Sequence, residues 1–111
     1  MDTLYLPLKK EWFEKIASGE KTTEYREVKP YWIRRLRRSV LALHRGRFEQ
    51  IPGKIYDRVC FSLGYGGKTM FFEIADIYVV NGKDTDLAIE KPVYAIKLGR
   101  RLTSITEINR K

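Results

Sequence analysis

Residues able to donate, accept and carry charge crowd one short segment, GEKTTEYRE, at residues 19–27. The side chains of an extended strand alternate between its two faces. Unless a bulge breaks this parity, the two faces carry Thr22, Glu24 and Arg26 on one side and Lys21, Thr23, Tyr25 and Glu27 on the other.

Two interpretations of this strand stay open at this point. An exposed sheet edge crossed by a Glu24–Arg26 ion pair would stabilise the fold by about 0–1 kcal/mol. A polar cleft would instead bring Lys21 and Arg26 against an anionic or amide-bearing ligand. The strand alone favours neither interpretation.

Glu73 is a second candidate site residue because it lies inside an apolar run, MFFEIAD. A carboxylate in such a run either faces a partly dry interior, where it would act together with Lys21 and Glu24, or it points to water while Phe72 and Ile74 turn inward. Both orientations are compatible with the sequence.

Basic residues are concentrated in two parts of a chain whose formal charge is +8. Residues 26–47 hold eight basic residues and one acid, a net +7, and residues 97–111 hold five basic residues and one acid, a net +4. The rest of the chain is slightly acidic. Such a distribution favours a polyanionic partner, and Arg34, Arg35 and Arg38 are the candidate phosphate contacts. The alternative is a solvated helix face with a loose tail.

A glycine-rich segment, SLGYGGKT at residues 62–69, predicts a hairpin turn. It does not match the phosphate-binding pattern GxxxxGK[ST]. Tyr65 at its tip is a candidate to stack on a nucleobase.

Length and composition indicate one domain over residues 1–111. The single cysteine, Cys60, lies in the apolar run VCFSL and predicts a buried, unreactive thiol. The start MDTLYLPLKK lacks a signal-peptide pattern and no apolar stretch approaches about 20 residues, so we expect a cytoplasmic protein without a membrane partner. With one histidine and one cysteine in the chain, we expect no metal and no cofactor.

Hydrophobic periodicity and breaker residues predict the order β-α-β-α-β-β-β, an α+β fold built as a small mixed barrel flanked by two or three short helices. The expected strands are 3–8, 21–28, 57–65, 69–80 and 92–99, and the expected helices are 9–19 and 31–43. Residues 86–91 predict a further helical turn, and residues 44–54 a loop.

Several of these segments together resemble the ASCH family, a branch of the PUA-like β-barrels. LPLKKEWFEKIASGEK runs into GEKTTEYRE, which fits the pattern G-x-K-x-x-[ET]-x-R. FSLGYGG, FFEIADI and VYAIKLG resemble the later barrel strands, so the likeness covers nearly the whole chain. The resemblance implies that the charged strand lines a cleft at the barrel mouth, beside the first helix.

The resemblance implies several activities. PUA-like barrels typically bind RNA, and ASCH domains are proposed to recognise RNA or modified nucleotides. Some small ASCH proteins are amidohydrolases that deacylate N4-acetylcytidine with a lysine, a threonine and a glutamate, and one branch is described as ribonucleases. Lys21 matches that lysine and Glu73 matches that glutamate. Glu24 stands at the threonine position, with Thr22 and Thr23 out of register.

We therefore expect first a binding module for RNA or a modified nucleotide, and second a hydrolase. In the binding module Lys21, Glu24 and Arg26 would contact the ligand with help from Tyr65, Arg34, Arg35 and Arg38. In the hydrolase Lys21, Glu24 and Glu73 would surround an acylated nucleoside. A glutamate cannot attack an amide as a threonine hydroxyl does, so hydrolysis would need a carboxylate acting as general base on water. The sequence leaves the oligomeric state open.

Overall fold

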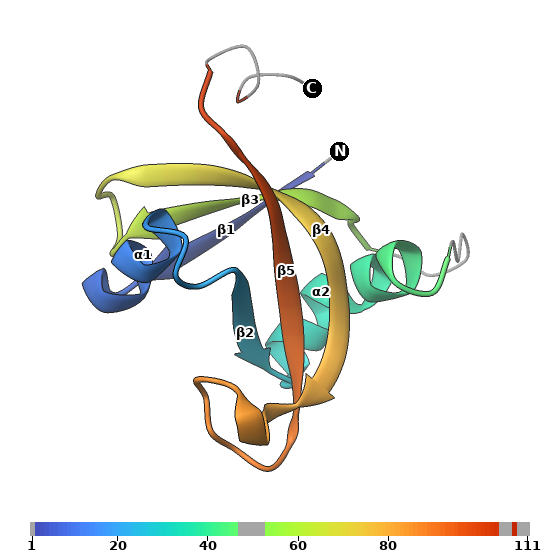
Figure 1. The fold of residues 1–111 in the computed structure, drawn as a ribbon. Helices are drawn as coiled ribbons and strands as arrows, with labels where there is room; N and C mark the ends of the chain where they lie inside the picture. Colours follow the sequence, from blue (N-terminus) through green and yellow to red (C-terminus); the bar gives the residue numbers. More distant parts are fainter. Residues whose placement is uncertain (1, 47–52, 105–107, 109–111) are drawn as a thin grey trace.

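The computed structural model of the chain describes residues 2–46, 53–104 and 108. It is a small α+β domain that contains five strands, two α-helices and one short 3-10 helix (Figure 1). The elements in chain order are β1 (Asp2–Leu8), α1 (Lys10–Ala17), β2 (Thr23–Glu27), α2 (Pro30–Leu43), β3 (Tyr56–Leu63), β4 (Thr69–Asn81), η1 (Gly82–Asp84) and β5 (Pro92–Leu102).

The five strands form one mixed sheet in the order β1-β3-β4-β5-β2. The pair β1–β3 is parallel, and the other neighbours are antiparallel. The sheet curls into a half-barrel, and β1 and β2 are its two edges (Figure 1). Register shifts in β4 on both sides of Ile74 provide part of the curl, because a bulge bends a strand and increases its twist.

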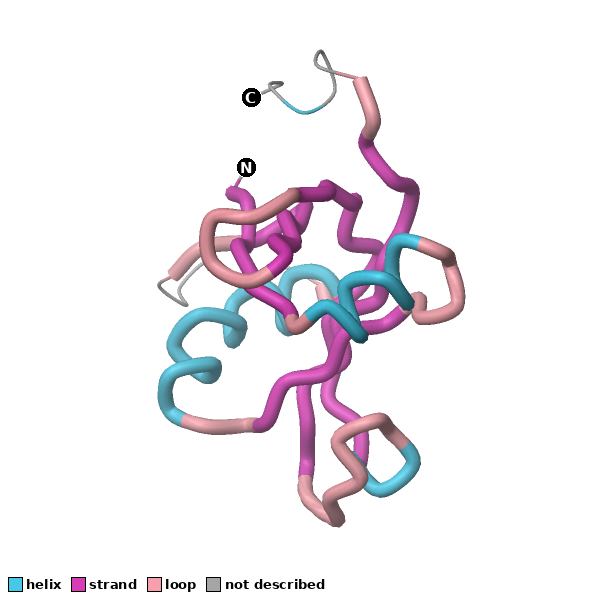
Figure 2. Tube along the Cα trace, turned by 90° about the vertical axis from the view of Figure 1, so that its left-hand side faces the viewer, coloured by secondary structure: helices cyan, strands magenta, loops and turns pink. Residues whose placement is uncertain are grey.

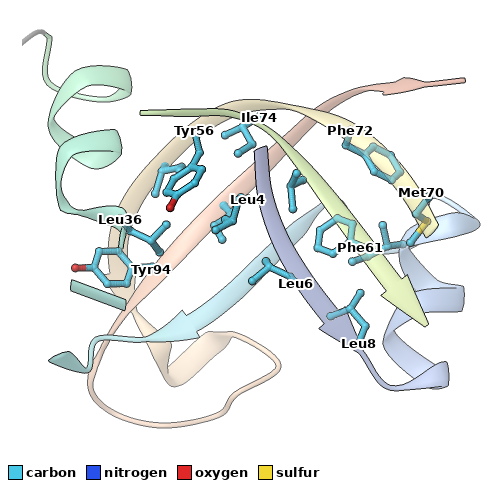
Figure 3. Packing of buried hydrophobic residues seen from close by; sticks show 14 of the residues in the cluster. Leu4, Leu6, Leu8, Leu36, Tyr56, Phe61, Met70, Phe72, Ile74 and Tyr94 are labelled. Atoms are coloured by element: carbon cyan, nitrogen blue, oxygen red, sulfur yellow. The ribbon is translucent and has the colours of Figure 1, made fainter. Parts of the chain in front are cut away.

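The concave side of the half-barrel holds the hydrophobic core. Alternate residues of β1 point into it, and Leu4, Leu6 and Leu8 belong there to the same buried cluster as Phe61 (Figure 3). Of the two orientations that the sequence left open for Glu73, the structure has the one that faces water, because Met70, Phe72 and Ile74 are buried while Glu73 is exposed.

A buried serine fixes α2 to this core. Ser39 is fully buried, its hydroxyl accepts from the Tyr56 amide at 2.9 Å, and it donates to the Lys54 carbonyl at 3.3 Å. Leu36 and Val40 are buried on the same side of the helix. The inner face of α2 is therefore tied to the start of β3.

Local signals set the ends of both helices. Gly19 has φ +84°, a left-handed conformation that suits glycine, and the chain turns there so that the Lys21 amide donates to the Lys15 carbonyl at 3.0 Å. Pro30 is the first residue of α2, and Lys29 before it is extended. The end of α1 lies two residues before the expected one, and the start of α2 lies one residue before the expected one.

The connection between β4 and β5 differs from expectation. The helical turn lies at Gly82–Asp84, not at residues 86–91, because the Asn81 side chain accepts from the Lys83 amide and starts the turn. Ala88 has φ +49°, which ends any helical continuation. A Cβ at Gly82 would lie 2.7 Å from the Ile89 carbonyl oxygen, so the loop closes tightly there. β5 is also longer than expected and continues to Leu102.

The β4–β5 loop lies at the opposite end of the molecule from the start of β1 and the end of β5, as both views show (Figure 1, Figure 2). Within the expected loop at residues 44–54, residues 47–52 lie outside the described residues. Among the described helices, none combines the length and the apolar character needed to span a bilayer.

Candidate ligand-binding cleft

A cleft of about 410 Å³ lies where the two edges of the half-barrel face each other. The end of β1, the start of α1, Lys21 with most of β2, the start of α2 and the loop after η1 all contribute to its lining. Small-molecule sites typically measure about 300–1,000 Å³, so this cleft can admit a ligand of modest size.

Glu24 is the centre of an ion-pair network in this cleft. Its side chain is 7 % exposed; Oε1 lies 3.0 Å from Lys21 Nζ, and Oε2 lies 2.8 Å from Arg26 Nη2 and 3.0 Å from Arg26 Nε. Asp86, from the loop after η1, binds the same Lys21 ammonium. Two cations and two carboxylates thus neutralise one another, as partly buried charges require.

The network corrects the expected face assignment for Lys21. Strict alternation placed Lys21 on the face opposite Glu24, yet the two side chains form an ion pair. The reason is that β2 begins only at Thr23, so Lys21 belongs to the turn after α1 and does not follow the parity of the strand. The predicted Glu24–Arg26 pair on one face is confirmed.

Aromatic rings flank the network. Lys21 Nζ lies 4.8 Å from the centre of the Trp12 ring and 5.6 Å from that of Tyr25, and the Arg26 guanidinium lies 5.3 Å from that of Trp32. All three rings line the cleft. Cation–π contacts of this kind hold the charged groups in place at the cleft wall.

The cleft itself is nearly neutral. Its lining contains four cationic residues and three acidic ones, a net +1, against +8 for the whole chain. The acids do not stand alone, since Glu27 lies 3.5 Å from Lys29 and the other two belong to the Glu24 network. Most of the positive charge is therefore outside the cleft.

The outer side of α2 carries part of that charge. Arg34 and Arg35 are exposed, and Arg35 lies 5.0 Å from the centre of the Tyr31 ring. Among the described residues, neither arginine has a carboxylate within ion-pair distance. Arg38 differs, because it donates to the Gly53 carbonyl at 2.9 Å. Trp32, near the start of the same helix, lines the cleft.

Five of the eight sequence-predicted residues are absent from the cleft lining: the three α2 arginines described above, Glu73 and Tyr65. Glu73 is 49 % exposed in β4, its carboxylate is 3.5 Å from Arg100, and it is absent from the cleft lining. Tyr65 is 94 % exposed at the tip of the β3–β4 hairpin and is also absent from the lining. Of the expected hydrolytic set, the structure brings together Lys21 and Glu24 but not Glu73.

Sequence reasoning missed Asp86 as a site residue. It lies 65 residues from Lys21, and the sequence around it predicted only a helical turn. Trp12 and Trp32 also line the cleft, although neither was among the predicted site residues. No local pattern distinguishes a tryptophan that packs on the core from one that packs on the core and lines a cleft.

The remaining reactive side chains lie outside the cleft lining. Cys60 is buried; burial raises the pKa of its thiol, and the nearby Arg58 guanidinium partly opposes that shift. His44, at the end of α2, has its Nδ1 3.1 Å from the Asp76 carboxylate. Across residues 2–46, 53–104 and 108, no group of three or more His, Cys, Asp or Glu side chains is placed to hold a metal ion.

Comparison with models of known families, with curated proteins and with solved structures finds no match for this chain.

Proposed function

We propose that the chain is an ASCH-type, PUA-like module that binds single-stranded RNA or a modified nucleotide. One base enters the cleft between β1 and β2, and the phosphates lie along the arginine side of α2. The element order and the GEKTTEYRE segment support the family assignment, as a resemblance.

The observation that carries the proposal is the separation of charge from the cleft. A nearly neutral, aromatic-lined cleft suits an uncharged planar group rather than a polyphosphate. The arginine-covered helix beside it suits the phosphate backbone. RNA presents these two chemistries side by side, since sequence-tolerant single-strand binding combines base stacking with backbone attraction.

Within the proposal, each side chain has a distinct part. Lys21 and Arg26 direct donors into the cleft, and Glu24 positions both of them because its two oxygens are already engaged. Arg34 and Arg35 attract phosphates. Arg38 contributes less, since part of its guanidinium binds the Gly53 carbonyl.

Titration of a fluorescein-labelled single-stranded RNA hexamer tests the proposal, at salt concentrations between about 50 and 200 mM. We expect binding that weakens with salt. Lys21→Ala should lower the affinity at both salt concentrations, because it removes a cleft donor. No change in anisotropy with up to about 100 μM protein at the lower salt would overturn the proposal, since even non-specific binding typically reaches that affinity.

Hydrolysis of an acylated nucleoside is a second candidate, favoured by one observation: Lys21 lies between two carboxylates, Glu24 and Asp86. A carboxylate would take a proton from water, hydroxide would attack the acyl carbon, and the amine would leave with that proton as the C–N bond breaks. Asp86 would then hold the position that the sequence assigned to Glu73.

Incubation with N4-acetylcytidine distinguishes the two candidates. Release of acetate and cytidine that is lost in Asp86→Asn and retained in Glu73→Gln would establish the hydrolase. Under the binding proposal we expect neither turnover nor shortening of the RNA hexamer after the same incubation, the latter being the sign of a ribonuclease.

A further inference from the structure

The backbone of β2 has one side that no other strand covers. β2 is the last strand in the sheet order, and among the described strands it pairs only with β5. In an antiparallel pair, opposite residues alternate between those that exchange hydrogen bonds and those whose N–H and C=O groups point away from the partner. Once one such hydrogen bond is known, this alternation gives the direction of the N–H and C=O groups of every residue along the strand.

One such hydrogen bond, between β5 and the residue just before β2, runs from the Leu98 amide to the Thr22 carbonyl, at 3.0 Å. These two residues continue the register in which Thr23 faces Lys97 and Tyr25 faces Ala95. Glu24 and Arg26 thus exchange bonds with β5, whereas the N–H and C=O groups of Tyr25 and Glu27 point to the open edge. Among the described residues, no backbone or side-chain group bonds to them there.

Tyr25 and Glu27 both line the cleft. The carboxylates in the lining are already engaged: Glu24 and Asp86 bind Lys21, and Glu27 lies near Lys29. The cleft therefore offers few side-chain acceptors to a ligand. Tyr25 is half-buried, and its main chain offers one donor and one acceptor, side by side, neither of which has a partner among the described residues.

We propose that the Tyr25 main chain recognises the hydrogen-bonding edge of an unpaired nucleobase, its N–H donating to a ring nitrogen or carbonyl and its C=O accepting from the adjacent N–H. This inference rests on the proposed function and specifies its ligand as a base whose Watson–Crick edge is free. A base already paired in a duplex has no such edge to offer.

An added peptide strand fits this edge less well. β2 is five residues long, and Trp12 of α1 and Trp32 of α2 line the same cleft. Strand addition uses a run of backbone groups along an open edge. Here the outward-pointing groups within the cleft belong to two residues, which matches one planar base.

Comparison of Tyr25→Pro with Tyr25→Ala tests the inference. Both variants remove the phenol ring, but only proline removes the N–H. Proline is tolerated here because this N–H makes no ladder bond and lies on an edge strand. With the four nucleoside 5′-monophosphates as probes, we expect the tightest binder to lose about tenfold more affinity in Tyr25→Pro than in Tyr25→Ala, the equivalent of about 1.4 kcal/mol.

Amide hydrogen exchange on the wild-type protein gives a second readout that needs no variant. The Tyr25 amide should become protected when the tightest-binding monophosphate is present, and the same nucleotide methylated on its Watson–Crick edge should give no protection. The matched reference is the Arg26 amide, which bonds to β5 and should be protected with or without ligand.

The outcomes separate this inference from the proposed function. If a monophosphate or the RNA hexamer binds the wild type, yet the Tyr25 amide stays unprotected and the two variants bind equally, the main-chain contact is wrong while RNA binding stands. If neither the monophosphates nor the RNA hexamer bind, both proposals fail.

Discussion

The cations of the cleft and those on the outer side of α2 carry the same charge in opposite surroundings. Lys21 and Arg26 are 12 % and 23 % exposed and share the buried Glu24 carboxylate, whereas Arg34 and Arg35 are exposed and have no carboxylate partner among the described residues. The first pair is held by shared ion pairs, whereas the second pair faces solvent, with Arg35 packed only against the Tyr31 ring among the described contacts.

Because of this difference, the cleft cations are suited to recognising a ligand and the outer arginines to attracting one. Partly buried, mutually bonded groups hold one geometry and so discriminate between ligands, because an ill-fitting ligand leaves desolvated groups unpaired. Exposed charges act over a distance, and salt screens them within about 10 Å at 0.1 M. Removing a member of the network should therefore change stability and specificity, and removing an outer arginine should change mainly the salt dependence.

The largest expected effect is that of Glu24→Ala. It leaves Lys21 and Arg26 partly buried without their shared carboxylate, and we expect the free energy of unfolding to fall by about 3–5 kcal/mol in urea titrations. Glu73→Ala is the matched control, since Glu73 also lies on a strand near an arginine but is 49 % exposed; its loss should cost about 0–1 kcal/mol. Equal effects would show that burial does not distinguish the two pairs.

The next largest expected effect on stability comes from a comparison of variants on the two sides of α2. Ser39→Ala leaves the buried Tyr56 amide without its acceptor, and we expect a loss of about 1–3 kcal/mol in the same measurement. Arg35→Ala on the outer side should change stability by less than about 0.5 kcal/mol. A Ser39→Ala protein as stable as wild type would mean that water or another group replaces the hydroxyl.

Removal of the outer arginines should alter RNA binding more than folding. For the Arg34→Ala/Arg35→Ala double variant, we expect the slope of log affinity against log salt to become shallower by about 1.4, which is about 0.7 for each lost phosphate contact to a single strand. Binding of nucleoside monophosphates should change little. Lys68→Ala/Lys83→Ala removes the same charge from other exposed positions; an equal change of slope there would assign the attraction to net charge and not to α2.

The smallest effect concerns alkaline pH. Burial raises the pKa of Tyr94 above its ordinary value of 10.0, with Arg37 acting in the opposite direction. The folded state therefore favours the neutral phenol over the ionised one. The contribution of the neutral Tyr94 phenol to stability is complete below pH 10 and is lost as the pH rises from there through the folded pKa. At pH 10 the loss is at most about 0.4 kcal/mol, the value reached when half of the unfolded-chain phenols and none of the folded ones are ionised.

Tyr94→Phe should remove this part of the pH dependence, and unfolding midpoints measured between about pH 9 and 11 should decline less steeply than in wild type. Tyr5→Phe is the control, since Tyr5 is exposed. An unchanged slope in Tyr94→Phe would indicate that other groups dominate alkaline unfolding.

Local sequence determined much of the fold. Gly19 and Pro30 mark the end of α1 and the start of α2, and the alternation of MFFEIAD correctly allowed Glu73 to face water. The order of strands and helices also followed from periodicity. These features depend on residues within one or two turns of each other, where steric and hydrogen-bonding preferences act directly.

The errors in the sequence-based predictions also have local physical causes. The helical turn lies at Gly82–Asp84 and not at residues 86–91 because the Asn81 side chain caps it. Lys21 does not follow the alternation of β2 because the strand starts at Thr23, two residues after the expected start. Short polar segments carry weak periodicity, so their boundaries depend on which side-chain bonds form.

By itself, the sequence determined the Glu24–Arg26 pair, the basic character of α2 and the buried cysteine, because each follows from neighbours along the chain. Only the tertiary structure brought Asp86 to Lys21, took Glu73 away from the cleft, and left the Tyr25 peptide groups at an open edge. Those relations depend on the curl of the sheet and on strand order, which arise from packing between residues distant in sequence, and such packing leaves no signal in any short stretch of the chain.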